Sequence, residues 1–250
     1  MKHKKLAILA VLILFISIGT FIIYKNTYVE KFNYVALGDS VAAGRNPYGV
    51  EDYGYTDYIK DYLKKRNKLN SYVSYAVSGY TTDNVSSDVN YNKSVEVNGE
   101  TINIKKALRE SDLVTISIGA NDFLGGMSLS TIPAKLNDNE TVLKQIDETI
   151  IKIEDLLTLI KQYAKGQIIV VGYYNPLPSL TKYKSQIDEV VNYADVQYIK
   201  ICDKLDIDYV KVSSIISANK EYLPNPLDIH PNKMGYEAIS EEVIKAIRYN

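Results

Sequence analysis

Five short apolar runs alternate with helical patterns along most of the chain, and this alternation restricts the possible fold more than any other feature. The runs lack a strict alternation with polar residues, as expected of parallel strands covered on both faces. They predict strands at Tyr34–Leu37, Tyr72–Ala76, Leu113–Ile118, Ile168–Gly172 and Ile207–Val212. Strands and helices in this order favour a three-layer α/β/α fold around a doubly wound parallel sheet of five strands.

Apolar residues in the intervening segments recur at spacings of three and four, which is the period of an amphipathic helix. They predict a helix from about residue 53 and three more over the stripes Leu143–Ile160, Ile187–Leu205 and Tyr236–Ile247. Gly166 is expected to end the helix that carries the stripe Leu143–Ile160 with a left-handed cap.

One insertion interrupts this order. Residues 95–104 alternate apolar and polar side chains around Asn98-Gly99, which predicts a β-hairpin with a two-residue turn beside the active site. We find no repeat and no second domain.

The N-terminus predicts a membrane segment. An uncharged run, Leu6–Tyr24, follows three lysines and precedes Lys25. Nineteen helical residues span about 28 Å, close to the thickness of a bilayer. The lysines before the run favour a cytoplasmic N-terminus. We therefore expect an N-terminal transmembrane helix as an anchor at residues 1–25, a linker at 26–32 and an extracytoplasmic domain at 33–250.

A cleaved signal peptide is the alternative, with secretion of the mature protein. Ser17-Ile18-Gly19 is a small-x-small triplet suited to cleavage, but the apolar residues Phe21–Ile23 would then remain as a stub. No cysteine follows the run, which excludes lipoprotein processing. The single cysteine, Cys202, lies in a helical apolar stripe and is expected in the core.

The charge balance argues against a nucleic-acid partner. Residues 1–31 hold five lysines and one glutamate, so the rest of the chain carries 24 basic and 29 acidic residues. Such a mildly acidic body does not suit a phosphate backbone. The sequence has no histidine pair at helical spacing, no cysteine cluster, no P-loop and no dinucleotide fingerprint, so we expect neither a metal nor a cofactor.

Four motifs lie where such a sheet collects catalytic groups, after strands or in the last loop. They are Gly38-Asp39-Ser40, Ser78-Gly79, Gly119-Ala120-Asn121-Asp122 and the segment Pro226–Pro231. Each alone is a weak signal, since such residues are common in turns and caps. Together they define a candidate site.

In order and spacing, these motifs resemble those of the SGNH/GDSL hydrolase family, from about Tyr34 to the end of the chain. The resemblance implies a flavodoxin-like hydrolase domain and a serine esterase or lipase activity. It also implies an oxyanion hole made by the backbone N–H groups of Ser40 and Gly79 and by the side-chain amide of Asn121. Asp122 matches a residue that is generally structural.

A serine hydroxyl needs a base to become a nucleophile. The chain has two histidines, and His3 lies on the far side of the apolar run, so His230 is the only candidate base for Ser40. The family places its acid three residues before this histidine, where the chain has Leu227. Asp228 lies two before, and an extended backbone before Pro231 allows the contact. We predict Asp228 as the acid; a Ser-His dyad is the alternative.

The leading hypothesis is an esterase or lipase-like acylhydrolase acting on a lipid or small ester near the membrane. A carbohydrate or peptidoglycan O-acetylesterase and a non-catalytic binding protein on a degenerate scaffold stay open. Residues 123–139 mix glycines with apolar side chains, which suits either a lid over an acyl chain or a plain surface loop. No oligomeric state is predicted.

Overall fold

The apolar runs form one parallel sheet, as predicted. A computed structural model describes residues 31–125 and 138–249, of which Phe32–Tyr249 form one compact unit. Its strands are β1 (Phe32–Gly38), β2 (Leu69–Ser74), β5 (Leu113–Ser117), β6 (Gln167–Val171) and β7 (Asp208–Val210). The order is β2-β1-β5-β6-β7, with every neighbouring pair parallel. This is the doubly wound, flavodoxin-like order.

The strand bounds differ most from the prediction in the two edge strands, β2 and β7. The strand predicted at Tyr72–Ala76 begins three residues earlier, at Leu69, and the strand predicted at Ile207–Val212 shortens to Asp208–Val210. An edge strand is paired on one side only, so solvent-exposed polar residues such as Asn70 and Ser71 are tolerated there. An apolar pattern therefore misplaces the ends of these strands.

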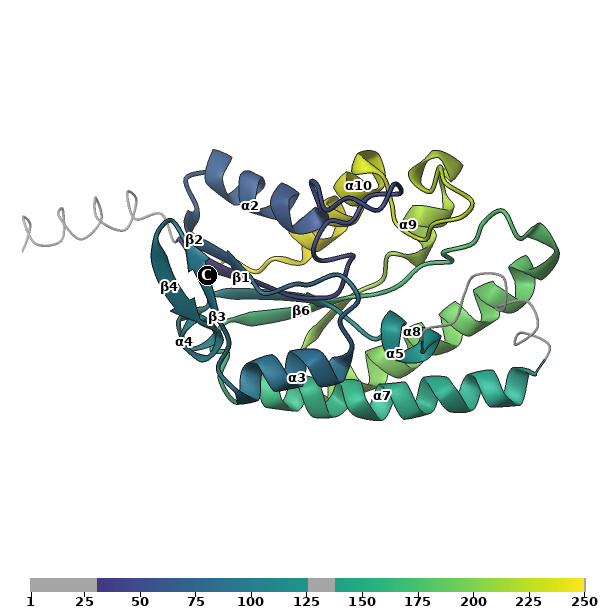
Figure 1. The fold of residues 1–250 in the computed structure, drawn as a ribbon, viewed down its shortest axis with the longest axis horizontal. Helices are drawn as coiled ribbons and strands as arrows, with labels where there is room; N and C mark the ends of the chain where they lie inside the picture. Colours follow the sequence, from purple (N-terminus) through teal and green to yellow (C-terminus); the bar gives the residue numbers. More distant parts are fainter. Residues whose placement is uncertain (1–30, 126–137, 250) are drawn as a thin grey trace, which may run out of the picture. The chain divides into compact units, whose positions relative to one another are not determined.

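The helices cover the sheet on both faces (Figure 1). One face carries α2 (Tyr55–Lys65), α9 (Ser213–Ser217) and α10 (Lys233–Ala246), and the other carries α3 (Thr82–Asn90), α4 (Ile104–Glu110), α7 (Asn139–Lys161) and α8 (Lys184–Leu205). Alternate residues of β1 enter the two cores. Tyr34 and Ala36 pack with α2 and α10, whereas Val35 and Leu37 pack with α7 and α8.

The cap predicted at Gly166 is wrong. Helix α7 already ends at Lys161, and the residue that follows it, Gln162, stays in the right-handed helical region. Gly166 has no positive φ and lies just before β6, where a Cβ atom would come within 2.3 Å of the carbonyl group of Asp112. The glycine is therefore needed for close backbone packing at the start of the sheet.

The hairpin is present as β3 (Ser94–Val97) and β4 (Glu100–Asn103). Asn98 and Gly99 have φ values of 52° and 82°, which suits a type I′ turn. At its base, the amino group of Lys93 donates to the hydroxyl of Tyr80 at 2.8 Å. In Figure 1, however, β3 and β4 lie at the end of the sheet where β1 begins, so the prediction that the hairpin lies beside the active site, at the carboxyl ends of the strands, is wrong.

Two predictions lie outside the described residues: the membrane segment Leu6–Tyr24 and most of the segment 123–139. Within residues 31–125 and 138–249, no helix is both long enough and apolar enough to cross a membrane. Cys202 is buried in the core, as predicted, and burial raises the pKa of its thiol to about 12.

Candidate active site

Ser40 lies at the carboxyl end of β1, and a glycine places it there. Gly38 has a φ of 126°, and a Cβ atom at this position would come within 2.1 Å of the Ser117 carbonyl oxygen on β5. Only glycine fits this close approach. The next N–H, that of Asp39, donates to the same Ser117 oxygen at 3.0 Å, and the chain then turns into the loop that carries Ser40.

His230 joins Ser40 to Asp228. The Nε2 atom of His230 lies 2.8 Å from the Ser40 hydroxyl oxygen, and its Nδ1 atom lies 2.6 Å from Asp228 Oδ1. Ser40 and His230 are both buried, with 8% and 7% of their surface exposed. The structure thus brings together the three side chains that the sequence singled out.

The displaced acid reaches the histidine through a local turn. Asp228 Oδ1 also accepts a hydrogen bond from the backbone N–H of His230 at 2.8 Å, which is the pattern of an Asx turn. This turn allows a carboxylate two residues before the histidine to meet its ring. Immediately after, Asn232 caps α10 by accepting from Gly235 N at 3.0 Å, which fixes the far end of the loop.

Burial lowers the pKa of His230 below its ordinary value of 6.5. The hydrogen bond and the negative charge of Asp228 act in the opposite direction, and the positive charge of Arg45 lowers the pKa further. The net lowering keeps the imidazole neutral at neutral pH, which is the form that can accept a proton from serine.

The donors predicted by resemblance for the oxyanion hole lie in the segments that follow β1, β2 and β5. Gly79, with a φ of 85°, is the third residue of a turn closed by Tyr80 N and Val77 O at 3.2 Å, and nothing lies within 4 Å of a Cβ atom built on it. Neither the Ser40 N–H nor the Gly79 N–H donates to any described residue. Asn121 gives one amide hydrogen to the Tyr80 carbonyl oxygen at 2.9 Å and keeps the other.

Two aspartates near the site hold the backbone. Asp122 accepts from the backbone N–H and the hydroxyl of Thr82, at 2.9 and 2.6 Å, and so fixes the start of α3. Asp39 is buried beside Ser40, accepts from the Val41 N–H at 3.0 Å and is bonded by the Tyr173 hydroxyl. Burial raises the pKa of Asp39 to about 6. No sequence pattern predicted the contact between Tyr173 and Asp39.

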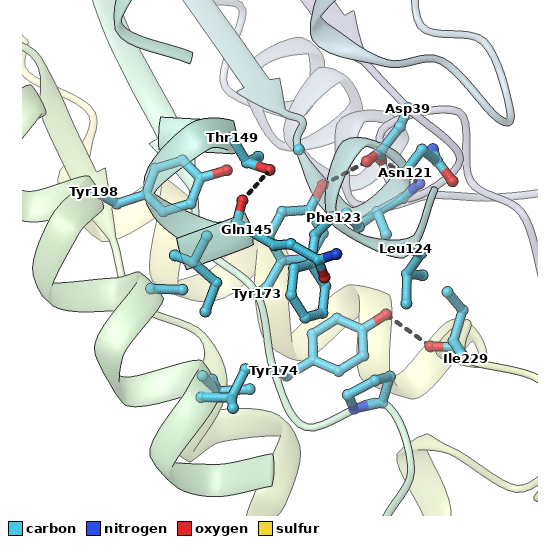
Figure 2. Close-up of a pocket in the computed structure, with 18 of the residues that line it drawn as sticks. Asp39, Asn121, Phe123, Leu124, Gln145, Thr149, Tyr173, Tyr174, Tyr198 and Ile229 are labelled. Carbon is cyan, nitrogen blue, oxygen red and sulfur yellow. Dashed lines mark hydrogen bonds between the residues drawn. The ribbon is translucent and has the colours of Figure 1, made fainter. Parts of the chain in front are cut away.

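An apolar cavity of about 150 Å³ opens beside Ser40. Figure 2 shows Phe123, Gln145 and Tyr173 pointing toward one another within it. Helices α7 and α8 supply most of its aliphatic wall: Val142, Ile146, Ile150, Ile153, Ile187, Val190, Val191 and Ala194. Near Ser40, the wall is held by the Tyr174 hydroxyl, which donates to Ile229 O at 3.0 Å. Sequence reasoning missed this cavity.

Comparison with known proteins decides the family. Residues 36–238 match the family model described as the GDSL-like Lipase/Acylhydrolase family. This chain belongs to that family. It is accordingly a serine hydrolase that acts on ester bonds, and a non-catalytic binding role on this scaffold is not retained. No curated protein matches the sequence significantly.

Solved structures share the fold of this family member. A lipase from a goat rumen metagenome is 21% identical, with a TM-score of 0.66 over 88% of this chain and 97% of its own. The extracellular lipase of Streptomyces rimosus is 17% identical, with a TM-score of 0.66 over 88% and 100%. An acetylxylan esterase of Geobacillus stearothermophilus is 15% identical, with a TM-score of 0.59 over 89% and 96%.

Within the described residues, no group of three histidine, cysteine or acidic side chains is arranged to hold a metal ion.

Proposed function

We propose that this hydrolase cleaves carboxylic esters by a Ser-His-Asp mechanism. The observation that carries the proposal is the hydrogen-bonded chain from Asp228 through His230 to Ser40. The Ser40 oxygen attacks the ester carbonyl carbon while its proton passes to Nε2 of His230. Asp228 orients the ring and stabilises the imidazolium that forms.

The negative charge that develops on the carbonyl oxygen meets the N–H groups of Ser40 and Gly79 and the free amide hydrogen of Asn121. Donors held in place before the reaction stabilise such charge without reorganisation. When the tetrahedral intermediate collapses, the imidazolium gives its proton to the departing alcohol. Water then attacks the acyl-enzyme with His230 again as base, which releases the acid and restores Ser40.

The cavity favours a lipase-like substrate over an O-acetyl ester. The structural neighbours include both lipases and an acetylxylan esterase, so the fold alone does not separate the two. An acetyl group would leave an apolar cavity of about 150 Å³ empty. Dry cavities of this size hold a benzene-sized guest, so we propose an acyl chain of about six carbons.

A chain-length series tests this substrate class. We expect kcat/KM for p-nitrophenyl esters to peak near the hexanoate, and Ala194→Phe, which fills the cavity, to move the optimum toward the acetate. Val196→Phe is the matched control, because Val196 lies on the same helix with 48% of its surface exposed. An acetate optimum in the wild type would favour an O-acetylesterase for carbohydrate or peptidoglycan.

We also propose that the domain is tethered outside the cell by residues 1–25. The proposal rests on the apolar run Leu6–Tyr24 with lysines before it. The chain enters the sheet at Phe32, the first residue of β1, whereas Ser40 follows the opposite end of that strand. Retention in the membrane after a carbonate wash, with the C-terminus open to external protease, is expected; mature protein in the medium would mean signal cleavage.

A further inference from the structure

Arg45 lies beside the catalytic centre without a protein partner for its charge. It is partly buried. Among the described residues, no carboxylate lies within salt-bridge distance of its guanidinium, and none of its side-chain N–H groups donates a hydrogen bond. An arginine normally uses its planar fork of donors on a carboxylate or phosphate. A ligand is therefore the candidate partner for the donors of the Arg45 guanidinium.

The backbone holds Arg45 firmly in the loop that follows the nucleophile. Its N–H donates to the Ser40 carbonyl oxygen at 2.9 Å, and its own carbonyl oxygen accepts from the Tyr236 hydroxyl at 2.6 Å. The loop is also tied to the histidine loop, since the Asn225 amide donates to Pro47 O at 2.7 Å. Hydrogen bonds therefore hold in place the backbone that carries the guanidinium.

Gly49 lies directly under the guanidinium. A Cβ atom on Gly49 would lie 3.2 Å from Nη2 of Arg45, so the guanidinium rests closely over the glycine backbone. Gly49 has a φ of 83°, so the turn at this point favours glycine. The charge is also near enough to His230 to lower the pKa of its imidazole.

Arg45 and the acyl cavity belong to opposite faces of the sheet. The cavity is walled by α7 and α8, which cover one face, and Arg45 is not part of its lining. The carbonyl oxygen of Arg45 is bonded by Tyr236 of α10, and its neighbour Gly44 packs against Gly54 at the start of α2; both helices cover the other face. An ester with its acyl group in the cavity can therefore extend its alcohol part toward the loop that carries Arg45.

We propose that Arg45 is a specificity residue that binds an anionic group, a phosphate or a carboxylate, on the alcohol part of the ester. The inference rests on the proposed function for the position of the acyl group. The substrate is then an amphiphile, with a short apolar acyl chain on one side of the ester bond and a negative charge on the other. The anion offsets the positive charge beside His230, which must itself become positive during the reaction.

The test compares matched neutral and anionic esters. 1-Hexanoylglycerol is paired with its 3-phosphate, and phenyl hexanoate with 4-carboxyphenyl hexanoate, so the two pairs distinguish phosphate from carboxylate. At pH 8, Arg45→Gln is expected to lower kcat/KM for an anionic ester about tenfold to a hundredfold, the usual effect of losing a charged hydrogen bond. The neutral partner should change less than about threefold in the same variant. Arg45→Lys should restore part of the loss.

Arg66→Gln is the matched control. Arg66 follows the last residue of α2, near the end of the sheet where β1 begins and away from Ser40. It should leave both pairs unchanged. An equal loss for neutral and anionic esters in Arg45→Gln, or the same selective loss in Arg66→Gln, overturns the inference.

A binding measurement separates this inference from the proposed function. Calorimetry on Ser40→Ala gives the Kd of 1-hexanoylglycerol 3-phosphate without turnover, and adding Arg45→Gln should raise it at least about tenfold. An unchanged Kd overturns the role of Arg45. Binding through Arg45 in a wild-type protein that hydrolyses no ester would contradict the proposed function and support the inference.

Discussion

The two halves of the catalytic centre are prepared to different degrees. In the proton-transfer half, Ser40, His230 and Asp228 are already joined by contacts of 2.8 and 2.6 Å. In the oxyanion half, the N–H groups of Ser40 and Gly79 have no acceptor among the described residues. In the proposed mechanism, the base is therefore in place before the substrate binds, whereas the oxyanion donors gain their acceptor only from the substrate.

Ser40→Ala should have the largest effect, because it removes the nucleophilic oxygen and leaves only the Ser40 backbone N–H in the site. We expect a folded protein with esterase activity lower by about three orders of magnitude or more, since the residues of a triad act as a unit. Thermal unfolding should confirm the fold. Activity within tenfold of the wild type would contradict the assignment.

Asn121→Ala tests the oxyanion half alone. Loss of one oxyanion donor lowers kcat about 10²–10³-fold, with little change in KM. The amide also donates to the Tyr80 carbonyl oxygen at 2.9 Å, so thermal unfolding of the variant should check that the fold is kept. A change confined to KM would assign Asn121 to substrate binding.

Asp228→Asn tests the proton-transfer half. We expect kcat to fall about a hundredfold or more with the melting temperature within a few degrees, because the amide no longer stabilises the imidazolium. The pKa of His230 is already lowered by burial, and Asp228 opposes that effect. The acid limb of the pH–rate profile should therefore lie below pH 6.5 in the wild type and lower still in the variant. Near-full kcat in Asp228→Asn, together with an inactive His230→Ala, would show a dyad.

Gly79→Ala should have the smallest effect. The new Cβ atom meets nothing within 4 Å, so the change tests backbone strain at a φ of 85° without a clash. We expect a stability loss of about 1–2 kcal/mol and kcat lower by about tenfold as the donor shifts. Gly38→Ala is the contrast, because its Cβ would lie 2.1 Å from Ser117 O and should prevent folding. Equal losses of stability in Gly79→Ala and Gly38→Ala would mean that the space beside Gly79 is filled.

The sequence predicted what depends on local pattern. The sheet, the hairpin turn at Asn98-Gly99 and the positions of Ser40 and Asn121 after strands follow from apolar runs and strand ends. His230 was predicted because it is the only histidine able to reach Ser40, and the structure confirms the contact. The contact of Asp228 with His230 was predicted from an extended backbone, and the structure makes it through an Asx turn.

The sequence did not predict what depends on packing between distant segments. Tyr173 follows β6, at the end of the sheet where catalytic groups are expected. It was not predicted as a site residue, because two adjacent tyrosines do not indicate a catalytic role. The cavity beside Ser40 is lined largely by α7 and α8, and their apolar stripes look like ordinary core in the sequence. The cap predicted at Gly166 was wrong for the same reason, because the contact of Gly166 with Asp112 joins segments 54 residues apart.

If His230 activates Ser40 as a nucleophile, an electrophilic probe should label this serine covalently. A fluorophosphonate probe reacts with an activated serine, and mass spectrometry of the digested protein locates the adduct. We expect one adduct on Ser40, absent from Ser40→Ala and strongly reduced in His230→Ala. An adduct on another residue, or labelling of Ser40 at the wild-type rate in His230→Ala, would contradict it.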